Sequence, residues 1–458
     1  MRVVLGILAT VAVLLVLYLA AVAVVPDLHS DAALIPVIFG ALVLLICLNV
    51  PIAVALAVSG ILGLLLTEGT DSLVTVALDM YDGSTKFSLI AIPMFVLAGA
   101  IMNAGGVTDR LINFVAALIG FVRGGLAMVN IGVSLFFAEI SGSAVADVAA
   151  MGSILIPQMK KRGYSAPFSA AVTSSSASLA IIIPPSIPMI LYATSANTSV
   201  EQLFVAGVIP GLMGAFGLMF VAYMFARRYN LPTEEAFNLR RLRETFVDAL
   251  PAFTLPVIIL GGIFGGFVTA TEAAGLAVLA ALAVGLWYNE LDLRHLKRAM
   301  LDGGMQTAVV MLLVAASVLM GGFLTRAQLP QDLAAWLLGV TSNKWVILLI
   351  LNVFFLVIGF FLHSAAAIIL VVPIVIPLIT AAQIDPVHFG LVVTLNLAIG
   401  QQTPPVASVL ITSCAVARAN IWEVSKVNIW FVLVLLTVLM ICTYLPQVPL
   451  FLVEYFYR

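Results

Sequence analysis

Two double prolines with polar neighbours are the features of this sequence best suited to chemistry. The first is Pro184-Pro185, followed by Ser186, and the second is Pro404-Pro405, preceded by Thr403. A proline lacks the backbone N–H and its ring clashes with the preceding turn, so a helix must open at each pair. The opened turn frees carbonyl oxygens, which suit a hard cation such as sodium. Each double proline therefore predicts a helix break that could coordinate sodium.

Two short polar turns accompany the breaks. One is Ser141-Gly142-Ser143, between two apolar segments, and the other is His363-Ser364. Helix N-termini that follow such turns and breaks carry partial positive charge and free N–H groups, which favour a carboxylate. We therefore predict that these four places bind a carboxylate substrate. The candidate substrate residues are Ser143, Pro184, Pro185, Ser186, Ser364, Pro404 and Pro405.

A hydroxyl-rich run, Thr173 to Ser178, lies just before the first break. Small hydroxyl residues pack membrane helices closely, but they can also supply oxygen ligands, and the sequence leaves both readings open. If the run binds an ion, Ser176 and Ser178 are the expected ligands. Asp147 also has two possible interpretations. It is either a functional charge or a charge near the turn that reaches water. Glu272, three residues after Thr269, is expected to cap a helix.

The composition indicates that the chain lies mainly in lipid. Of 458 residues, 63% are apolar and 9% are charged, against about a quarter charged in soluble domains. Several apolar runs reach the roughly 20 residues that cross a bilayer. We expect an all-α polytopic membrane protein, not an enzyme, a disordered chain or a nucleic-acid binder. With a net charge of -2, the chain has no excess of basic residues to bind a polyanion. No nucleotide-binding loop or metal motif suggests a cofactor.

The first apolar segment, Val3 to Val25, resembles a secretion signal only superficially. It is much longer than the apolar core of a signal peptide, about 7–15 residues, so a retained transmembrane helix is preferred. We assign residues 1–35 to this extra helix and its loop, and residues 36–458 to one transmembrane domain. Within that domain we expect an apolar segment from Pro36 to Leu66 and one main soluble loop, Arg227 to Asp248.

Loop charges predict the orientation of the chain. The basic runs beginning at Lys160, Arg227 and Arg294 are placed in the cytoplasm, and the acidic stretch from Glu68 to Asp82 outside. Arg123 and Lys160 would both lie in the cytoplasm, and two short apolar segments separate them. They are expected to form a re-entrant hairpin whose tip, Ser141-Gly142-Ser143, is buried in protein or lines a wet cavity.

An internal repeat is suggested by the prolines. Pro404 lies 220 positions after Pro184 (404 − 184 = 220), and the same shift relates Pro405 to Pro185 and Pro377 to Pro157. Lys160-Lys161-Arg162 then corresponds to the uncharged Thr380-Ala381-Ala382, a contrast that opposite sides of the membrane would explain. We therefore expect inverted repeats, at about residues 84–226 and 304–446, each with one hairpin and one broken helix.

Several motifs in order resemble the large membrane subunit of TRAP (tripartite ATP-independent periplasmic) transporters. The resemblance covers the chain from about Pro36 to its end. The matching motifs are Ser141-Gly142-Ser143-Ala144-Val145-Ala146-Asp147, Ile156-Pro157-Gln158-Met159 with Gly163-Tyr164, Ile183-Pro184-Pro185-Ser186, Leu203-Phe204-Val205-Ala206-Gly207 with Pro210-Gly211, Thr271-Glu272-Ala273-Ala274, Ile384-Asp385-Pro386-Val387-His388-Phe389-Gly390 and Thr403-Pro404-Pro405.

This resemblance implies a sodium-driven importer of the bacterial inner membrane that works as an elevator. It also implies two partners, a small four-helix membrane subunit and a periplasmic substrate-binding protein, and an organic acid substrate such as a C4-dicarboxylate, sialic acid or sugar acid. The matched motifs imply that one set of residues binds the coupling ion. The set includes His363 at the second turn, and it also contains Ser176 and Ser178 from the hydroxyl-rich run. The set is Ser141, Gly142, Ser143, Ser176, Ser178, Ile183, His363, Gly400 and Thr403.

Two positions depart from the family pattern. His363 stands where the family usually has an aspartate, which leaves the second ion site and the choice of sodium over protons open, because a histidine can itself titrate. Ala407 stands where a glycine is usual. The alternatives are a stand-alone carboxylate carrier of the ion transporter superfamily, which needs no binding protein, and a channel; no residue pattern for an intramembrane protease is evident.

Overall fold

The computed structural model describes residues 31–48, 50–233 and 236–457, and these residues form helices and turns with no β-strand. The expected helix Val3–Val25 lies outside the described residues. Nine described helices are long and apolar enough to cross a membrane, or ten if one bent pair counts as a span. The prediction of an all-α polytopic membrane protein is confirmed.

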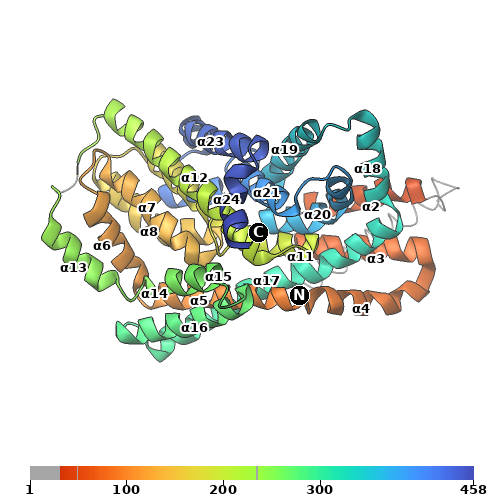
Figure 1. Ribbon diagram of the computed structural model, residues 1–458, viewed down its shortest axis with the longest axis horizontal. Coiled ribbons are helices and arrows are strands. Elements are labelled where there is room, and N and C mark those ends of the chain that lie inside the picture. The colour runs from red at the N-terminus through yellow and green to blue at the C-terminus, as the bar shows by residue number, and fades with distance from the viewer. Residues whose placement is uncertain (1–30, 49, 234–235, 458) are drawn as a thin grey trace. The chain divides into compact units, whose positions relative to one another are not determined.

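The chain folds into two compact units, whose helices are labelled in Figure 1. Unit 1 comprises the residues up to Lys86 with Ala308–Val340 and Ile369–Ala381, and unit 2 comprises Phe87–Thr307, Thr341–Ile368 and Ala382 onward. Two helices, α17 (Leu293–Arg326) and α20 (Ser364–Ala381), contribute residues to both units. The remaining helices of unit 1 are α2 (Asp31–Cys47), α3 (Ile52–Glu68), η1 (Gly69–Asp71), α4 (Ser72–Ser84) and α18 (Leu329–Val340).

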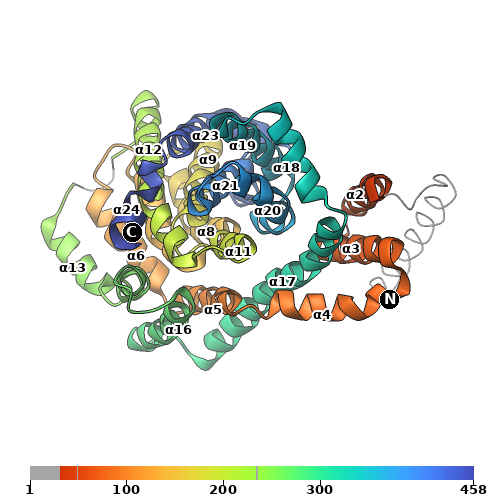
Figure 2. The ribbon, with the colours of Figure 1, turned by 45° about the vertical axis from the view of Figure 1, so that its right-hand side comes forward.

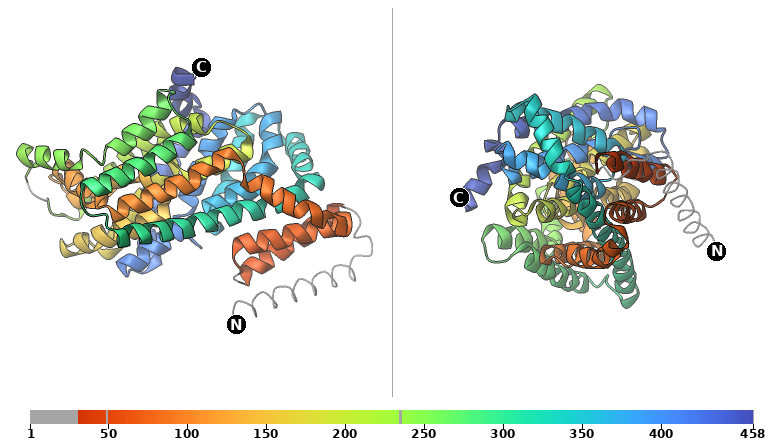
Figure 3. Two further views of the ribbon diagram at one scale, coloured as in Figure 1. Left: turned by 90° about the horizontal axis from the view of Figure 1, so that it is seen from below. Right: turned by 90° about the vertical axis from the view of Figure 1, so that its right-hand side faces the viewer.

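Unit 1 corrects one sequence expectation. The apolar stretch Pro36–Leu66 is two helices, because α2 ends at Cys47 and α3 begins at Ile52, just after Pro51. A proline is better tolerated at the start of a helix than in its interior, and Pro51 is the residue that precedes α3, although α2 does contain Pro36. The helices pack side by side (Figure 3) around a core that includes Leu56 and Phe323.

Unit 2 holds all the breaks and turns singled out in the sequence. Its helices before α17 are η2 (Phe87–Ile90), α5 (Ala91–Ala104), α6 (Val107–Ile119), α7 (Gly125–Ser141), α8 (Ala144–Lys161), α9 (Ala166–Ala177), α10 (Leu179–Ile182), α11 (Ile187–Ala196), α12 (Val200–Arg228), α13 (Leu239–Ala249), α14 (Thr254–Pro256), the π-helix η3 (Val257–Gly261), α15 (Gly262–Phe264) and α16 (Ala270–Trp287). Those in the second half are α19 (Lys344–Phe361), α21 (Pro386–Gly400), α22 (Ser408–Ala417), α23 (Ile421–Tyr444) and α24 (Gln447–Tyr457).

Burial distinguishes the centre of unit 2 from its rim. Nearly every residue of α9–α11 is buried, whereas α12 exposes Phe216 and Phe220 and α19 exposes Val353 and Val357. Exposed apolar side chains of this kind suit contact with lipid tails. Helices α9–α11 and α21 therefore form the interior of unit 2, whereas α22 exposes Ile411, and α8, α9, α11 and α21 lie together in Figure 2.

Two local expectations about α16 and the polar loop can be compared with the structure. Thr269 and Glu272 form the expected cap at the start of α16, since the Glu272 carboxylate accepts from the Thr269 N–H at 2.9 Å. The loop Arg227–Asp248 is less irregular than expected, because α13 occupies its second half. Only α14, η3 and α15 follow in the apolar stretch after it, and their axis is bent by 57° from α13.

Helix bounds in the two halves follow the 220-residue register. Shifted by 220, α8 covers 364–381, the bounds of α20, and α11 covers 407–416, one residue from α22. The Pro184-Pro185 and Pro404-Pro405 peptides are both cis. The two halves thus place these helices and the cis proline pairs at matching positions along the chain.

Candidate functional site

The first turn joins α7 to α8 through Gly142 and Ser143 alone. Gly142 adopts a left-handed conformation, with φ of 57°, which glycine tolerates best. A Cβ atom at Gly142 would lie 3.1 Å from the carbonyl oxygen of Pro185, so the turn packs directly on the first break. The structure thereby brings together two places that the sequence selected independently.

The first break runs from the end of α10 at Ile182 to the start of α11 at Ile187. The buried Ser186 hydroxyl donates to the carbonyl oxygen of Ile181 at 2.7 Å and accepts from the N–H of Met189 at 3.4 Å. This single side chain therefore bridges the two helix ends. The Ile182 carbonyl oxygen would be 2.3 Å from a Cβ at Gly207 of α12, so a glycine is needed where α12 passes the break.

The second break runs from Gly400, the last residue of α21, to Ser408, the first of α22. The N–H of Val406 donates to the carbonyl oxygen of Phe360 at 3.3 Å, which ties the break to the end of α19. The Thr403 hydroxyl donates to the carbonyl oxygen of Ile399 at 3.0 Å. Pro405 is exposed, whereas both prolines of the first break are buried, so the second break is the more open of the two.

Polar contacts join the two broken helices. Ser175 of α9 is fully buried, and its Oγ lies 2.8 Å from Oε1 of Gln402 and 2.7 Å from Oδ1 of Asn428. The Ser413 hydroxyl of α22 donates to the Ala170 carbonyl oxygen at 3.0 Å. Since α10 and α11 also contact α21, both breaks belong to one packed core.

The remaining candidate residues occupy different surroundings. The Ser176 hydroxyl donates to Oδ1 of Asn130 at 3.0 Å, a contact between α9 and α7, and the Ser178 hydroxyl donates to the Ser174 carbonyl oxygen at 3.3 Å within α9. Ser364 is buried and His363 is exposed. Ile183, at the first break, packs against Gly211 of α12. Ser141 is the last residue of α7, at the turn.

Sequence reasoning missed several buried amides. Gln402 and Asn428 are not among the candidate residues, although both contact Ser175 between the broken helices. Asn396 donates to Oδ1 of Asn352 at 2.7 Å, between α21 and α19, and corresponds to Ser176 under the 220-residue shift. Asn396 and Asn428 are single amides within apolar segments, and Gln402 follows Gln401 beside the second break; amides in such segments favour the bundle interior, a signal that could have identified them.

Replacing Ser175 with alanine should destabilise the protein by about 1–3 kcal/mol, because the hydroxyl that donates to one of two buried amide oxygens, Oε1 of Gln402 or Oδ1 of Asn428, is lost. A thermal melt of the purified protein measures the effect. The control is Ser153→Ala, since the exposed Ser153 hydroxyl bonds only within α8, to the Ala150 carbonyl oxygen. Equal melting temperatures for the two variants would contradict a structural role for Ser175.

The backbone conformation of Ala407 concerns one of the two departures from the family pattern. It is buried at the start of α22 with φ of 45°, a conformation that favours glycine. Replacing Ala407 with glycine should therefore stabilise the protein by about 1 kcal/mol, because a Cβ in this conformation costs about 1–2 kcal/mol. The melting temperature checks this, with Ala415→Gly in the last turn of α22 as the control, where a glycine should destabilise the helix. A lower melting temperature for Ala407→Gly would refute the argument.

The arrangement offers neutral oxygen ligands and helix N-termini. Carbonyl oxygens before each break suit a hard cation, and the N-termini of α8, α11 and α22 suit an anion. Within the described part of the chain, no three His, Cys, Asp or Glu side chains come together as a transition-metal site would require. At the breaks themselves, the groups available to a ligand are carbonyl oxygens and helix N-termini.

Comparisons with known proteins identify the family. Residues 39–448 match the family model described as tripartite ATP-independent periplasmic transporter, DctM component. The chain is 39% identical to the C4-dicarboxylate TRAP transporter large permease protein DctM of Pseudomonas aeruginosa, over 86% of this chain and 93% of that protein. It is 36% identical to the sialic acid TRAP transporter large permease protein SiaM of Vibrio cholerae, over 92% of this chain and 98% of that protein.

A solved structure shares the fold at low sequence similarity. The YdaH transporter of Alcanivorax borkumensis superposes with a TM-score of 0.60, at 14% identity, over 86% of this chain and 90% of the other. Since the family model spans most of the chain and the two permeases match it nearly end to end, the resemblance inferred from the motifs is confirmed. The chain belongs to the DctM component family of tripartite ATP-independent periplasmic transporters.

Proposed function

We propose that this protein is the permease subunit of a sodium-coupled importer of an organic acid in a bacterial inner membrane. A periplasmic binding protein would deliver the substrate, and a small four-helix membrane subunit would complete the complex. The family description, which names a tripartite periplasmic system, supports both partners. The names of the relatives, which transport a C4-dicarboxylate and sialic acid, support a carboxylate substrate.

One observation carries this proposal: two helix breaks lie in a single packed core, each in contact with a hairpin turn or its flanking helix. Carbonyl oxygens ending α10 and α21 would hold sodium, and the helix N-termini after the breaks and turns would hold the carboxylate. The ion-binding residues proposed are Ser141, Gly142, Ser143, Ser176, Ser178, Ile183, His363, Gly400 and Thr403. The substrate residues proposed are Ser143, Pro184, Pro185, Ser186, Ser364, Pro404 and Pro405.

The contacts between the halves favour an elevator mechanism. Lys160, at the end of α8, donates to the Ala417 carbonyl oxygen at the end of α22, at 3.0 Å. Together with Ser175 and Gln402, this contact ties the first hairpin and both broken helices into one body. A body held together in this way would carry ion and substrate as a unit, between inverted repeats at about residues 84–226 and 304–446.

Uptake into proteoliposomes tests the proposal. The purified permease with its small subunit should accumulate a carboxylate only when an inward sodium gradient and the binding protein are both present. Uptake of free substrate without the binding protein would support the stand-alone carrier, and substrate-independent current would support a channel. Family membership favours neither alternative.

Replacing His363 with aspartate should strengthen the sodium dependence of uptake, because a carboxylate at the second turn adds a negative oxygen ligand. We expect the half-saturating sodium concentration to fall several-fold, which corresponds to a gain of about 1 kcal/mol in binding free energy. The measurement is the initial uptake rate as a function of sodium, with His363→Asn as the uncharged control. An unchanged or higher half-saturating concentration would remove residue 363 from the ion site.

A further inference from the structure

One sequence motif has no part in the ion and substrate sites proposed above. It is the run Ile384–Gly390, which leads into α21 and forms its first turn. Asp385 caps the helix, because its Oδ1 accepts from the N–H groups of Val387 and His388 at 2.9 and 3.1 Å. A carboxylate also suits the positive end of a helix. Four residues of the motif make further contacts, with other helices.

Three of these four contact Tyr192 of α11. The Tyr192 hydroxyl donates to the Pro386 carbonyl oxygen at 2.8 Å, and its ring centroid lies 6.3 Å from that of Phe389. A Cβ at Gly390 would lie 2.3 Å from Cε1 of Tyr192, so the ring needs a glycine there. Residues 386, 389 and 390 share one face of the helix. The fully buried Tyr192 therefore fits against the first turn of α21.

The same turn is also held by the helices on its other sides. Nε2 of His388 lies 2.7 Å from the Cys442 carbonyl oxygen near the end of α23, which is a hydrogen-bond distance. The ring of Phe389 stands edge to face with Phe355 of α19, with centroids 6.0 Å apart. We call Tyr192 and residues 385–390 together the joint. The joint therefore fixes α11 to a turn that α19 and α23 hold in place.

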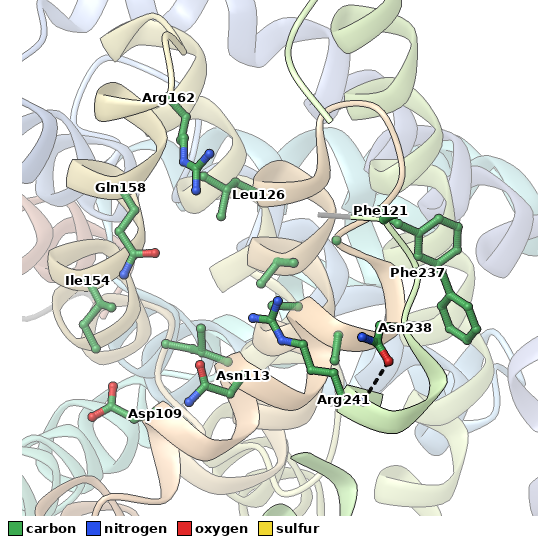
Figure 4. Close-up of a pocket in the computed structure, with 16 residues that line it drawn as sticks. Asp109, Asn113, Phe121, Leu126, Ile154, Gln158, Arg162, Phe237, Asn238 and Arg241 are labelled. Atoms are coloured by element: carbon green, nitrogen blue, oxygen red, sulfur yellow. Dashed lines mark hydrogen bonds between the residues drawn. The ribbon is translucent and has the colours of Figure 1, made fainter. Parts of the chain in front are cut away.

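The joint has little room for change. Phe389 and Tyr192 are both fully buried, and His388 is almost so. A cavity of about 500 Å³ does lie in unit 2, bounded by α6, α7, α8 and the segment that leads into α13 (Figure 4), but no residue of the joint lines it. A larger side chain at Gly390 therefore cannot use that space and has to displace the Tyr192 ring.

Helix α21 connects the joint to the second break. Tyr192 lies five residues after Ile187, the start of α11 at the first break, or about 8 Å along the helix axis. From Pro386, α21 runs without interruption to Gly400 at the second break, over about 21 Å. All its residues from Val387 onward are buried. Because a packed interior transmits displacement, a shift of α11 is carried along α21 to the second break.

We propose, on the basis of the proposed function in which sodium binds at both breaks, that the joint couples ion binding at one break to the conformation of the other. Tyr192 is a positioning residue in this scheme, since it sets α11 against α21 and touches neither ion nor substrate. Coupling of this kind is reciprocal, so each bound ion strengthens binding of the other.

Sodium-dependent uptake by Tyr192→Phe tests the coupling. The variant keeps the ring and removes the hydroxyl that donates to Pro386. In proteoliposomes with both partners, the half-saturating sodium concentration should rise by about fivefold, the equivalent of about 1 kcal/mol. The dependence on sodium should also become less steep, whereas the maximal rate should stay unchanged. A residue needed only for folding would lower the maximal rate instead.

Tyr288→Phe is the matched control. The Tyr288 hydroxyl also donates to a backbone carbonyl oxygen, that of Asp248, at 2.7 Å, but it lies just after α16 and outside the joint. We expect the sodium curve of this variant to match that of the unsubstituted protein. Gly390→Ala acts on the same contact as Tyr192→Phe, so the double variant should shift the curve by less than the sum of the two single shifts.

Hydrogen exchange measured by mass spectrometry reads the joint without transport. In Tyr192→Phe, amide exchange should be faster in α11 and in the first turn of α21, and unchanged in α16. Unchanged exchange there, or a sodium curve that matches that of Tyr288→Phe, refutes the joint alone. If uptake by the unsubstituted protein does not depend on sodium, the proposed function fails and the coupling fails with it.

Discussion

Replacing Gly400 with alanine should reduce sodium-driven uptake by about tenfold or more, because an alanine Cβ has no room there. The Cβ atom would lie 2.6 Å from both the carbonyl carbon and the Cα of Gly359, which are backbone atoms and cannot rotate away. Forcing extra volume into a packed contact costs about 1–3 kcal/mol. Since Gly400 ends α21 at the second break, the helix end that would hold the ion has to move.

Two other glycine substitutions make the test specific. Gly359→Ala approaches the same contact from α19, but its Cβ would lie 3.1 Å from the Cα of Gly400, so we expect a smaller loss. Gly275→Ala, in α16, meets no atom within 4 Å and should leave uptake unchanged while favouring the helix by up to about 1 kcal/mol. Initial uptake rates and melting temperatures of the three variants give the order. Normal uptake by Gly400→Ala would show that the close approach of α19 and α21 is dispensable.

The breaks were predictable because proline acts locally. Pro184-Pro185 and Pro404-Pro405 disrupt a helix whatever surrounds them, so the ends of α10 and α21 follow from the sequence. The short connection between α7 and α8 was predictable for a similar reason, since two short apolar segments meet at small polar residues. The 220-residue register relates the two halves from the sequence alone.

Other features depend on tertiary structure or on weak local signals. The contact of Ser175 with Gln402 joins residues 227 positions apart, and nothing in either segment specifies the partner. Helix α13 was missed because its polar and apolar residues alternate around a short helix, which reads as a loop in average hydropathy. Helices α18 and α24 are too short to appear as membrane spans.

The expectation for residues 36–66 was a single apolar segment, and it assigned no number of helices. Residues 36–66 form one apolar stretch, but they exceed what a single span requires, and Pro51 marks the start of a second helix. Apolar content indicates that a segment is buried in lipid or protein, whereas the proline and the turn residues set the helix ends. The helix break at Pro184-Pro185 could be predicted because polar residues lie beside this proline pair.

Replacing Gly142 with valine should raise the half-saturating sodium concentration by about tenfold, or about 1.4 kcal/mol of binding free energy. Two effects act together at this turn. A side chain at φ of 57° costs about 1–2 kcal/mol, and its Cβ would lie 3.1 Å from the Pro185 carbonyl oxygen, so the turn must shift away from the first break. The measurement is the initial uptake rate as a function of sodium in proteoliposomes with both partners.

Gly163 provides the matched control for Gly142. It also has a positive φ, of 86°, but a Cβ there would meet no atom within 4 Å. Gly163→Val therefore carries the conformational cost without the contact, and should lower the melting temperature while leaving the sodium response unchanged. If both variants lose stability and neither changes the sodium response, the turn between α7 and α8 has no part in ion binding. A sodium response altered by Gly142→Val alone would instead place the coupling ion where that turn meets the first break.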